Sequence, residues 1–266
     1  MIELPQHAKV VIVGAGIVGN SVAYHLANLG WKNMVMIDKG PLPNTGGSTG
    51  HASNFIFPVD HSKVMTQLTL DSMAQYRDLG VFRESGGIEI ARKPERMQEL
   101  KRRMASAKAW GIDASLVTPG EIKELFPWIN SVAIIGGFYC PSVGVVDSLR
   151  AGTKMRDRAK EMGALSVFTF TEITAIDVKD GQVKGLQTSK GNMTTEYIII
   201  CCGVWSPKIA KMAGVSMSLT PIVRAVLQTT PPAPTPRCTR IPCRATPPPP
   251  SRTDASSPRT RGRRRL

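Results

Sequence analysis

Residues 9–19, KVVIVGAGIVG, decide the fold of this chain. Residues 9–13 are short and rich in β-branched side chains, as in a buried parallel strand. Gly14, Gly16 and Gly19 follow in the pattern G-x-G-x-x-G. In that pattern the first glycine permits a tight turn, the second lets a pyrophosphate approach the backbone, and the third lets the next helix pack close to the strand. The stretch therefore predicts a strand, a turn and a helix whose N-terminus faces the phosphates of a dinucleotide.

The next elements complete a βαβ unit. We expect the helix to end near Leu29, with Gly30 as its cap, and residues 34–37 to form a second strand. Asp38 ends this strand, 24 residues after Gly14, where a carboxylate accepts hydrogen bonds from a ribose hydroxyl. A glycine-rich turn with an incidental surface aspartate is the plainer alternative. The expected buried stripe of the helix consists of Val18, Val22, Leu26 and Leu29.

Two later segments bear on the fold. Residues 41–62 form a loop that is too long for a simple connector, and long ordered loops are often functional. Residues 167–202 predict a β-meander, with one tight turn at Asp180-Gly181 and another at Lys190-Gly191-Asn192. Its last stretch, residues 197–202, is expected to be a densely buried strand. The order of these elements predicts an α/β fold.

The formal charge of +14 is unevenly distributed. From Arg224 onward there are ten Arg and one Asp, a net charge of +9, which leaves +5 for residues 1–223. The body of the chain is therefore only mildly basic, and the overall charge says little about its partner. Residues 231–266 contain ten prolines and almost no aliphatic residues, so we expect residues 224–266 to be a disordered basic tail.

Composition also argues against several classes of protein. No apolar run reaches about 20 residues, so neither a membrane span nor a membrane partner is expected. The N-terminus lacks a basic region followed by an apolar stretch, which argues against a secretory signal. The five cysteines show neither a metal spacing nor a disulfide framework. We therefore expect no metal site and a cytoplasmic location.

Segments outside the glycine pattern resemble the FAD-dependent oxidoreductases of the D-amino-acid-oxidase-like family. The meander followed by Tyr-Ile-Ile-Ile-Cys-Cys-Gly-Val-Trp-Ser at 197–206 is similar to the second signature of that family. The resemblance implies that Ile173 contacts the adenine through its backbone. It matches Gly203 and Trp205 to a Gly-x-Trp-type turn beside the flavin dinucleotide. FAD is therefore the expected cofactor.

The loop Gly47-Ser-Thr-Gly-His51-Ala carries the sharpest resemblance. It is similar to the Gly-Ser-Thr-x-His-Ala loop of the dimethylglycine and sarcosine dehydrogenase or oxidase subgroup. There the histidine holds the flavin covalently through a ring methyl group, so the resemblance implies that His51 attaches FAD. It also implies that Gly47, Ser48 and Thr49 lie near the pyrophosphate and the ring. A neutral imidazole is a suitable nucleophile for this attachment, and a loop histidine with ordinary hydrogen bonds is the alternative.

The resemblance covers residues 10–223 and departs from the subgroup in three places. Asn54 stands where a glycine is usual, and Arg224 stands where the subgroup has a histidine near the substrate. After Arg224 the resemblance ends, and the composition turns to Pro, Arg, Thr, Ser and Ala, as when GC-rich coding sequence is read in a wrong frame. We therefore expect a truncated chain whose amine oxidation is absent or very slow. Arg224 has the chemistry to clamp a substrate carboxylate, but it is more simply the first residue of the tail.

The resemblance implies three parts. An FAD-binding domain, with a Rossmann-type sheet and the β-meander, takes residues 1–60 and 145–223. A partial α+β substrate domain takes residues 61–144, and the tail takes residues 224–266. The implied reaction is the oxidation of an N-methylated glycine, dimethylglycine or sarcosine, by hydride transfer to flavin. The sequence identifies neither the electron acceptor nor a catalytic base.

Two other functions are weighed against this one. An NAD(P)-dependent dehydrogenase explains residues 14–38 but leaves the His51 loop and the meander unexplained. A nucleic-acid-binding protein acting through its basic tail is the second alternative, because Arg-rich disordered segments bind phosphate backbones. That tail has no aromatic residue to stack on bases, so a nucleic-acid partner is disfavoured.

Overall fold

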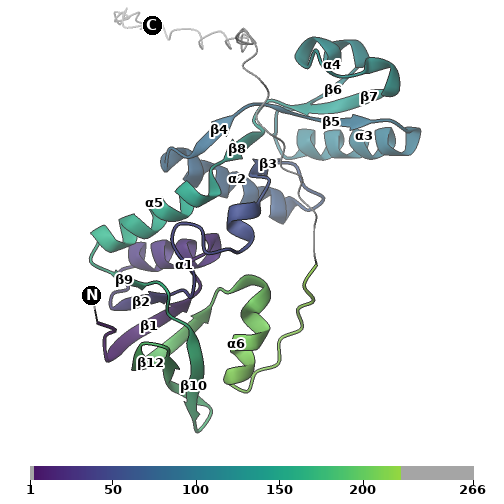
Figure 1. The fold of residues 1–266 in the computed structure, drawn as a ribbon. Helices are drawn as coiled ribbons and strands as arrows, with labels where there is room; N and C mark the ends of the chain where they lie inside the picture. The colour runs from purple at the N-terminus through teal and green to yellow at the C-terminus, as the bar shows by residue number, and fades with distance from the viewer. Residues whose placement is uncertain (1–2, 223–266) are drawn as a thin grey trace, which may run out of the picture. The chain divides into compact units, whose positions relative to one another are not determined.

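The structure is a computed structural model, and it describes residues 3–222. Its main element is a six-stranded sheet with the strand order β10-β11-β12-β1-β2-β9 (Figure 1). β12, β1, β2 and β9 run parallel, whereas β10, β11 and β12 form the antiparallel meander. The predicted α/β fold, with a Rossmann-type sheet and a meander, is confirmed. The strands are His7–Val13 (β1), Met34–Ile37 (β2), Leu165–Phe168 (β9), Ile173–Lys179 (β10), Gln182–Thr188 (β11) and Gly191–Ile200 (β12).

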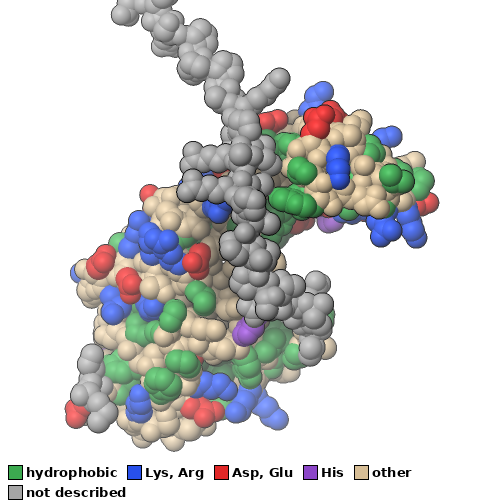
Figure 2. Space-filling model, turned by 45° about the horizontal axis from the view of Figure 1, so that its top comes forward, with side chains coloured by type: hydrophobic (Ala, Val, Ile, Leu, Met, Phe, Trp, Pro, Cys, Tyr) green, Lys and Arg blue, Asp and Glu red, His purple; other side chains and the backbone are tan. Residues whose placement is uncertain are grey.

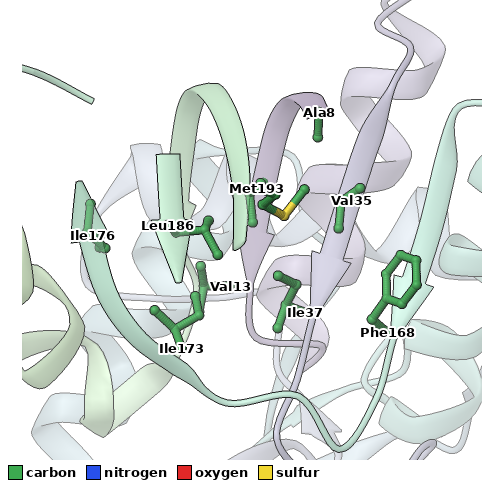
Figure 3. Close-up of a cluster of buried hydrophobic side chains, with 10 residues drawn as sticks. Ala8, Val13, Val35, Ile37, Phe168, Ile173, Ile176, Leu186 and Met193 are labelled. Carbon is green, nitrogen blue, oxygen red and sulfur yellow. The ribbon is translucent and has the colours of Figure 1, made fainter. Parts of the chain in front are cut away.

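Helices pack against both faces of this sheet (Figure 1). Helices α1 (Ile17–Asn28) and α5 (Ser148–Glu161) lie on one face, and α6 (Ser206–Met212) lies on the other. Successive strand residues point to opposite faces, so all six strands contribute side chains to a single buried cluster under α6. Figure 3 shows this cluster, with Ala8, Val13, Val35, Ile37, Phe168, Ile173, Ile176, Leu186 and Met193 labelled.

The predicted buried stripe of α1 is wrong at its two ends. Val18 and Leu29 are 60% and 76% exposed, and the middle of the stripe is only partly buried. The helix packs closely on the glycine turn and on α5, and most side chains of its buried face are small. A Cβ at Gly19 would lie 1.9 Å from the carbonyl oxygen of Gly14. The residues that α1 does bury are Gly19, Asn20, Ala23 and Ala27.

The strand expected at residues 197–202 belongs to β12, and it is less buried than predicted. Tyr197 is 50% exposed, and residues 198–200 are half-buried. The backbone of β12 is central in the sheet, between β1 and β11, but α1 packs on β1 and β2. Tyr197 therefore meets Trp31 edge-on, with ring centroids 5.9 Å apart, rather than the side of a helix.

Residues 55–146 contribute two three-stranded antiparallel sheets, β3-β8-β4 and β5-β7-β6 (Figure 1). Most of these elements fall within the segment expected to be a partial substrate domain, whose boundaries stay a prediction. The strands are Phe55–Ile56 (β3), Phe82–Glu84 (β4), Gly87–Ala91 (β5), Ser115–Val117 (β6), Gly136–Cys140 (β7) and Gly144–Val146 (β8). The helices are Lys63–Asp78 (α2), Pro94–Ala109 (α3) and Pro119–Leu125 (α4).

The described residues also bear on the partner classes. On the face drawn in Figure 2, Lys and Arg side chains are interspersed with Asp and Glu, unlike the single basic stripe typical of a nucleic-acid-binding surface. Within residues 3–222, no helix is long and apolar enough to cross a membrane. Nor do His, Cys, Asp and Glu side chains of that part of the chain gather into a group that could hold a metal ion. The predicted tail, residues 224–266, lies outside the described residues.

Gly19→Ala tests the contact between α1 and the glycine turn. The added methyl group overlaps a backbone oxygen, so we expect the free energy of unfolding to fall by about 1–3 kcal/mol, as in other overpacked cores. Urea unfolding followed by circular dichroism measures this. Val18→Ala is the control, because Val18 is largely exposed, and a change within about 0.5 kcal/mol is expected for it. Equal effects of the two substitutions would contradict the contact.

Candidate functional site

A cavity of about 440 Å³ lies where β1, β2 and β12 end. The carboxyl ends of parallel strands meet at one edge of the sheet, which is where open α/β folds bind their ligands. Segments far apart in the sequence converge there: the glycine turn, the loop at 47–49, the start of β10 and the turn after β12. Nine of the eleven residues predicted from the sequence line the cavity, namely Gly14, Gly16, Asp38, Gly47, Ser48, Thr49, Ile173, Gly203 and Trp205.

The three glycines of the first turn have different roles. Gly14 has a φ of +105°, and a Cβ there would lie 2.5 Å from the carbonyl oxygen of Cys201, so the fold itself requires glycine. Gly19 does not line the cavity and is required by its contact with Gly14. Gly16 has a φ of −69°, which any residue adopts. An added Cβ at Gly16 would lie 3.2 Å from the Thr49 hydroxyl oxygen, a tight contact for which Thr49 would have to move by a few tenths of an ångström.

Gly47 shows the same pattern as Gly16. Its φ is −90°, and an added Cβ would be in ordinary contact with the Trp205 ring, at 3.7 Å. Neither φ requires glycine, and neither added Cβ would overlap the backbone, although both positions face the cavity. A ligand that comes close to the backbone at both positions does explain them. The residues present thus fit a dinucleotide, whose pyrophosphate needs such an approach.

Asp38 is held at the cavity by two backbone hydrogen bonds. Its Oδ2 accepts from the N–H of Ala15 and its Oδ1 accepts from the N–H of Gly40, both at 2.7 Å. These bonds fix the carboxylate between the glycine turn and the loop after β2. A carboxylate oxygen has two acceptor positions, so Asp38 keeps capacity for a hydroxyl donor from a ligand.

Thr49 joins the loop to helix α1. Its hydroxyl oxygen accepts a hydrogen bond from the N–H of Ile17, at 3.0 Å, and so satisfies one of the donors that the start of a helix leaves unpaired. This arrangement leaves the hydroxyl proton for a ligand in the cavity. The carbonyl oxygen of Thr49 accepts from the hydroxyl of Ser148, at 2.7 Å. Sequence reasoning missed Ser148, which also lines the cavity, because no local pattern marks a contact across 99 residues.

His51 is exposed and does not line the cavity, although the adjacent Ala52 does. It ends the short 3₁₀ helix Ser48–His51. Its Nδ1 lies 3.0 Å from the carbonyl oxygen of Gly47. A carbonyl oxygen only accepts, so Nδ1 carries a proton, and in the neutral imidazole the lone pair is then on Nε2. Nε2 is therefore the nitrogen that can form a further bond.

Ile173, Gly203 and Trp205 line the cavity from the side of the meander. The Ile173 side chain is part of the core (Figure 3), so its backbone is what can face a ligand. Gly203 has a φ of +54°, and the Lys39 ammonium lies 5.5 Å from the Trp205 ring centroid. Three further charged residues of the wall were missed, namely Lys39, Glu172 and Lys208. Lys39 follows Asp38 and Glu172 precedes Ile173 in the sequence, and this proximity to predicted residues could have indicated both.

Cys201 and Cys202 follow β12 and form part of the same wall. Burial raises the pKa of Cys202 to about 11, and it also raises the pKa of Cys201. The Cys202 thiol donates to the carbonyl oxygen of Val13, at 3.2 Å. Both thiols therefore stay neutral at pH 7, and they give the cavity a weakly polar surface rather than a nucleophile.

Residues 9–266 match the protein family described as FAD dependent oxidoreductase. The chain belongs to this family. FAD, the expected cofactor, is thus the cofactor of its family, and the NAD(P)-dependent dehydrogenase alternative gains no support. The family match runs past residue 224, where we expected the resemblance to end.

Curated relatives are similar to most of the chain. It is 32% identical over 212 residues to the pyruvate dehydrogenase phosphatase regulatory subunit, mitochondrial, of Mus musculus. This match covers 77% of this chain and 24% of that protein. It is 31% identical over 239 residues to the mitochondrial sarcosine dehydrogenase of Mus musculus, and the match covers 85% of this chain and 26% of that protein. For the mitochondrial dimethylglycine dehydrogenase of Homo sapiens the identity is 29% over 222 residues, with 81% and 25% covered. The chain spans about a quarter of the length of these relatives.

Solved structures of the same family of folds are also similar. L-proline dehydrogenase from P. horikoshii superposes with a TM-score of 0.75 at 25% identity, covering 82% of this chain and 58% of that one. Glycine oxidase from Bacillus cereus ATCC 14579 superposes with a TM-score of 0.64 at 25% identity, with 77% and 57% covered. The fold of the chain therefore matches that of FAD-dependent oxidoreductase structures.

The structure explains one departure from the subgroup. Asn54 has a φ of +62°, in the left-handed region where glycine is the usual residue and asparagine is tolerated. Its carbonyl oxygen accepts from the N–H of Val146, at 2.8 Å, and so ties the end of the loop to β8. Asparagine therefore keeps the backbone path that a glycine would take. The other departure, Arg224, lies outside the described residues.

Gly16→Val tests whether the glycine serves a ligand rather than the fold. We expect the Kd for FAD to rise by at least about 100-fold, because the side chain occupies the space of the pyrophosphate. Without FAD, the free energy of unfolding should change by less than about 1 kcal/mol. Quenching of flavin fluorescence measures the first quantity and urea unfolding the second.

Gly120→Val is the matched control for that substitution. Gly120 is an exposed glycine of α4 that lies outside the cavity wall, so its replacement should leave FAD affinity unchanged. Unaltered affinity in a folded Gly16→Val protein would show that the cavity is not the nucleotide site.

Proposed function

We propose that the chain binds FAD in the cavity at the ends of β1, β2 and β12 and serves the oxidation of an N-methylated amine. The observation that carries this proposal is the convergence of separate predicted segments on one cavity. Gly16 and Gly47 face that cavity, and the fold alone requires glycine at neither position. Membership of the FAD-dependent oxidoreductase family supports the choice of FAD over other dinucleotides.

The wall residues that were predicted from the sequence are assigned to parts of FAD. The N-terminus of α1, with Gly16 and the Thr49 hydroxyl, offers hydrogen-bond donors to the pyrophosphate. The Asp38 carboxylate offers an acceptor to the ribose hydroxyls. The Ile173 backbone is assigned to the adenine. Gly47, Ser48, Gly203 and Trp205 are assigned to the remaining length of the dinucleotide.

We place the substrate among N-methylated glycines, dimethylglycine or sarcosine. The loop at 47–52 resembles that subgroup, and proteins named sarcosine and dimethylglycine dehydrogenase are among the relatives. When bound, the flavin supplies the two-electron acceptor for the oxidation of the N-methyl carbon. Hydrolysis of the resulting iminium ion releases formaldehyde and the demethylated amine. The chain's part is to hold the cofactor and substrate in register, and we assign no catalytic base. A cytoplasmic location stays a prediction.

The colour of the protein and its response to substrate test this function. We expect the chain reconstituted with FAD to be yellow after removal of free flavin. In the absence of oxygen, dimethylglycine or sarcosine should bleach that colour, however slowly, because each has an N-methyl carbon to oxidise. Glycine, which lacks that carbon, is the control. A yellow protein that none of the amines bleaches would leave the FAD site standing and contradict the proposal that this chain oxidises them.

Covalent attachment at His51 is tested separately. The bond of Nδ1 to the Gly47 carbonyl leaves Nε2 as the nitrogen for attachment, so we expect flavin to stay with the polypeptide after acid denaturation of the wild-type protein. His51→Ala should release all of it, whereas His61→Ala, a change at an exposed histidine, should release none. Flavin retained by His51→Ala would assign the attachment to another residue.

A further inference from the structure

Ser148 begins helix α5 and contacts a loop 99 positions earlier in the chain. The residue is only 8% exposed, and its hydroxyl lies 2.7 Å from the carbonyl oxygen of Thr49. The helix does not need this hydroxyl as a cap. The Asp147 side chain already accepts from the N–H of Arg150, at 2.9 Å, and caps α5. The hydroxyl of Ser148 is therefore engaged with the cavity loop and not with its own helix.

Two hydrogen bonds join the turn Ser48–His51 to the helices around it, and both end on Thr49. The side chain of Thr49 accepts from α1 through Ile17, and its carbonyl accepts from α5 through Ser148. Because one bond holds its side chain and the other its carbonyl oxygen, the position of Thr49 is fixed. The rotation of the peptide plane that follows Thr49 is fixed as well. Inside the turn, the Gly47 carbonyl lies 3.0 Å from Nδ1 of His51. The direction of the His51 ring therefore depends on a turn that is anchored at Thr49.

Helix α5 is a firm support for this anchor. Asn20 of α1 is 3% exposed, and its Nδ2 donates to the carbonyl oxygens of Ala15 and Gly16, at 2.8 and 3.0 Å. A Cβ at Gly152 would lie 2.9 Å from that same Nδ2. The helix therefore packs directly on the side chain that organises the glycine turn. Ser148 lies one helical turn before Gly152, so this packing also fixes the position of Ser148 relative to the glycine turn.

We propose that Ser148 is a positioning residue of the flavin site, whose hydroxyl holds Thr49 so that the Thr49 hydroxyl faces the cavity. The proposal rests on the proposed binding of FAD. Without the Ser148 hydroxyl, the Thr49 carbonyl loses its donor and the turn is tied to α1 alone. The Thr49 hydroxyl is then held only by its bond to the N–H of Ile17, so its direction toward the cavity is less firmly fixed. FAD therefore binds less tightly, although Thr49 keeps all of its atoms.

A double-mutant cycle on FAD affinity tests the role. We expect Ser148→Ala to raise the Kd for FAD by about tenfold, the effect of one buried hydrogen bond. Thr49→Val should raise it at least as much. The double variant should bind FAD no more than about threefold worse than Thr49→Val alone, because Ser148 acts through the Thr49 hydroxyl. A merely structural role of Ser148 would instead make the two effects multiply.

Two isosteric substitutions separate the loss of the hydroxyl from an effect of side-chain shape or of folding. Threonine and valine at position 148 have nearly the same shape, but only threonine keeps a hydroxyl. We therefore expect Ser148→Val to lose affinity for FAD and Ser148→Thr to keep it. Ser106→Ala, on α3 away from the cavity wall, should leave the Kd unchanged. Equal affinities of the threonine and valine variants, or independent effects in the cycle, would overturn the positioning role while the wild-type affinity for FAD stands. A wild-type protein that binds no FAD would overturn this role and the proposed function together.

Discussion

The contact of Gly19 with the carbonyl oxygen of Gly14 is the constraint on which the rest of the structure depends. A Cβ at Gly19 would come within 1.9 Å of that oxygen, and one at Gly14 would come within 2.5 Å of the Cys201 carbonyl. Strand β1, helix α1 and the end of β12 can meet at one point only because both residues are glycines. Their meeting turns the N-terminus of α1 toward the edge where three parallel strands end.

The cavity follows from that junction. The start of α1 offers unpaired N–H groups, and the loop at 47–51 docks on it through Thr49. Asp38 is drawn to the same edge because its carboxylate accepts from the glycine turn through Ala15. The glycines then divide into two kinds. Gly14 and Gly19 serve the close packing of the chain, whereas Gly16 and Gly47 leave backbone open to a ligand.

The fold could be predicted where its causes are local. The β-branched run before Gly14, the glycine spacing and the turn at Asp180-Gly181 each act over a few residues, and the structure has the sheet and meander that they predict. Burial could not be predicted in the same way. The exposure of Val18 and of Tyr197 depends on how closely α1 approaches the sheet and on which strands it covers.

The same division holds for the site. Residues in recognisable patterns, such as Asp38 and Gly47, could be predicted from the sequence, because each belongs to a motif of a few neighbouring residues. Ser148 has no such signature, since its contact with Thr49 joins two segments that only the folded chain brings together. Lys208, which also lines the cavity, was missed for the same reason.

A crystal structure of the chain grown with FAD would show whether this cavity is the flavin site. We expect one FAD in the cavity at the ends of β1, β2 and β12, with its pyrophosphate beside Gly16 and a ribose hydroxyl within hydrogen-bonding distance of the Asp38 carboxylate. An FAD molecule bound elsewhere on the chain, or an empty cavity at saturating FAD, would contradict it.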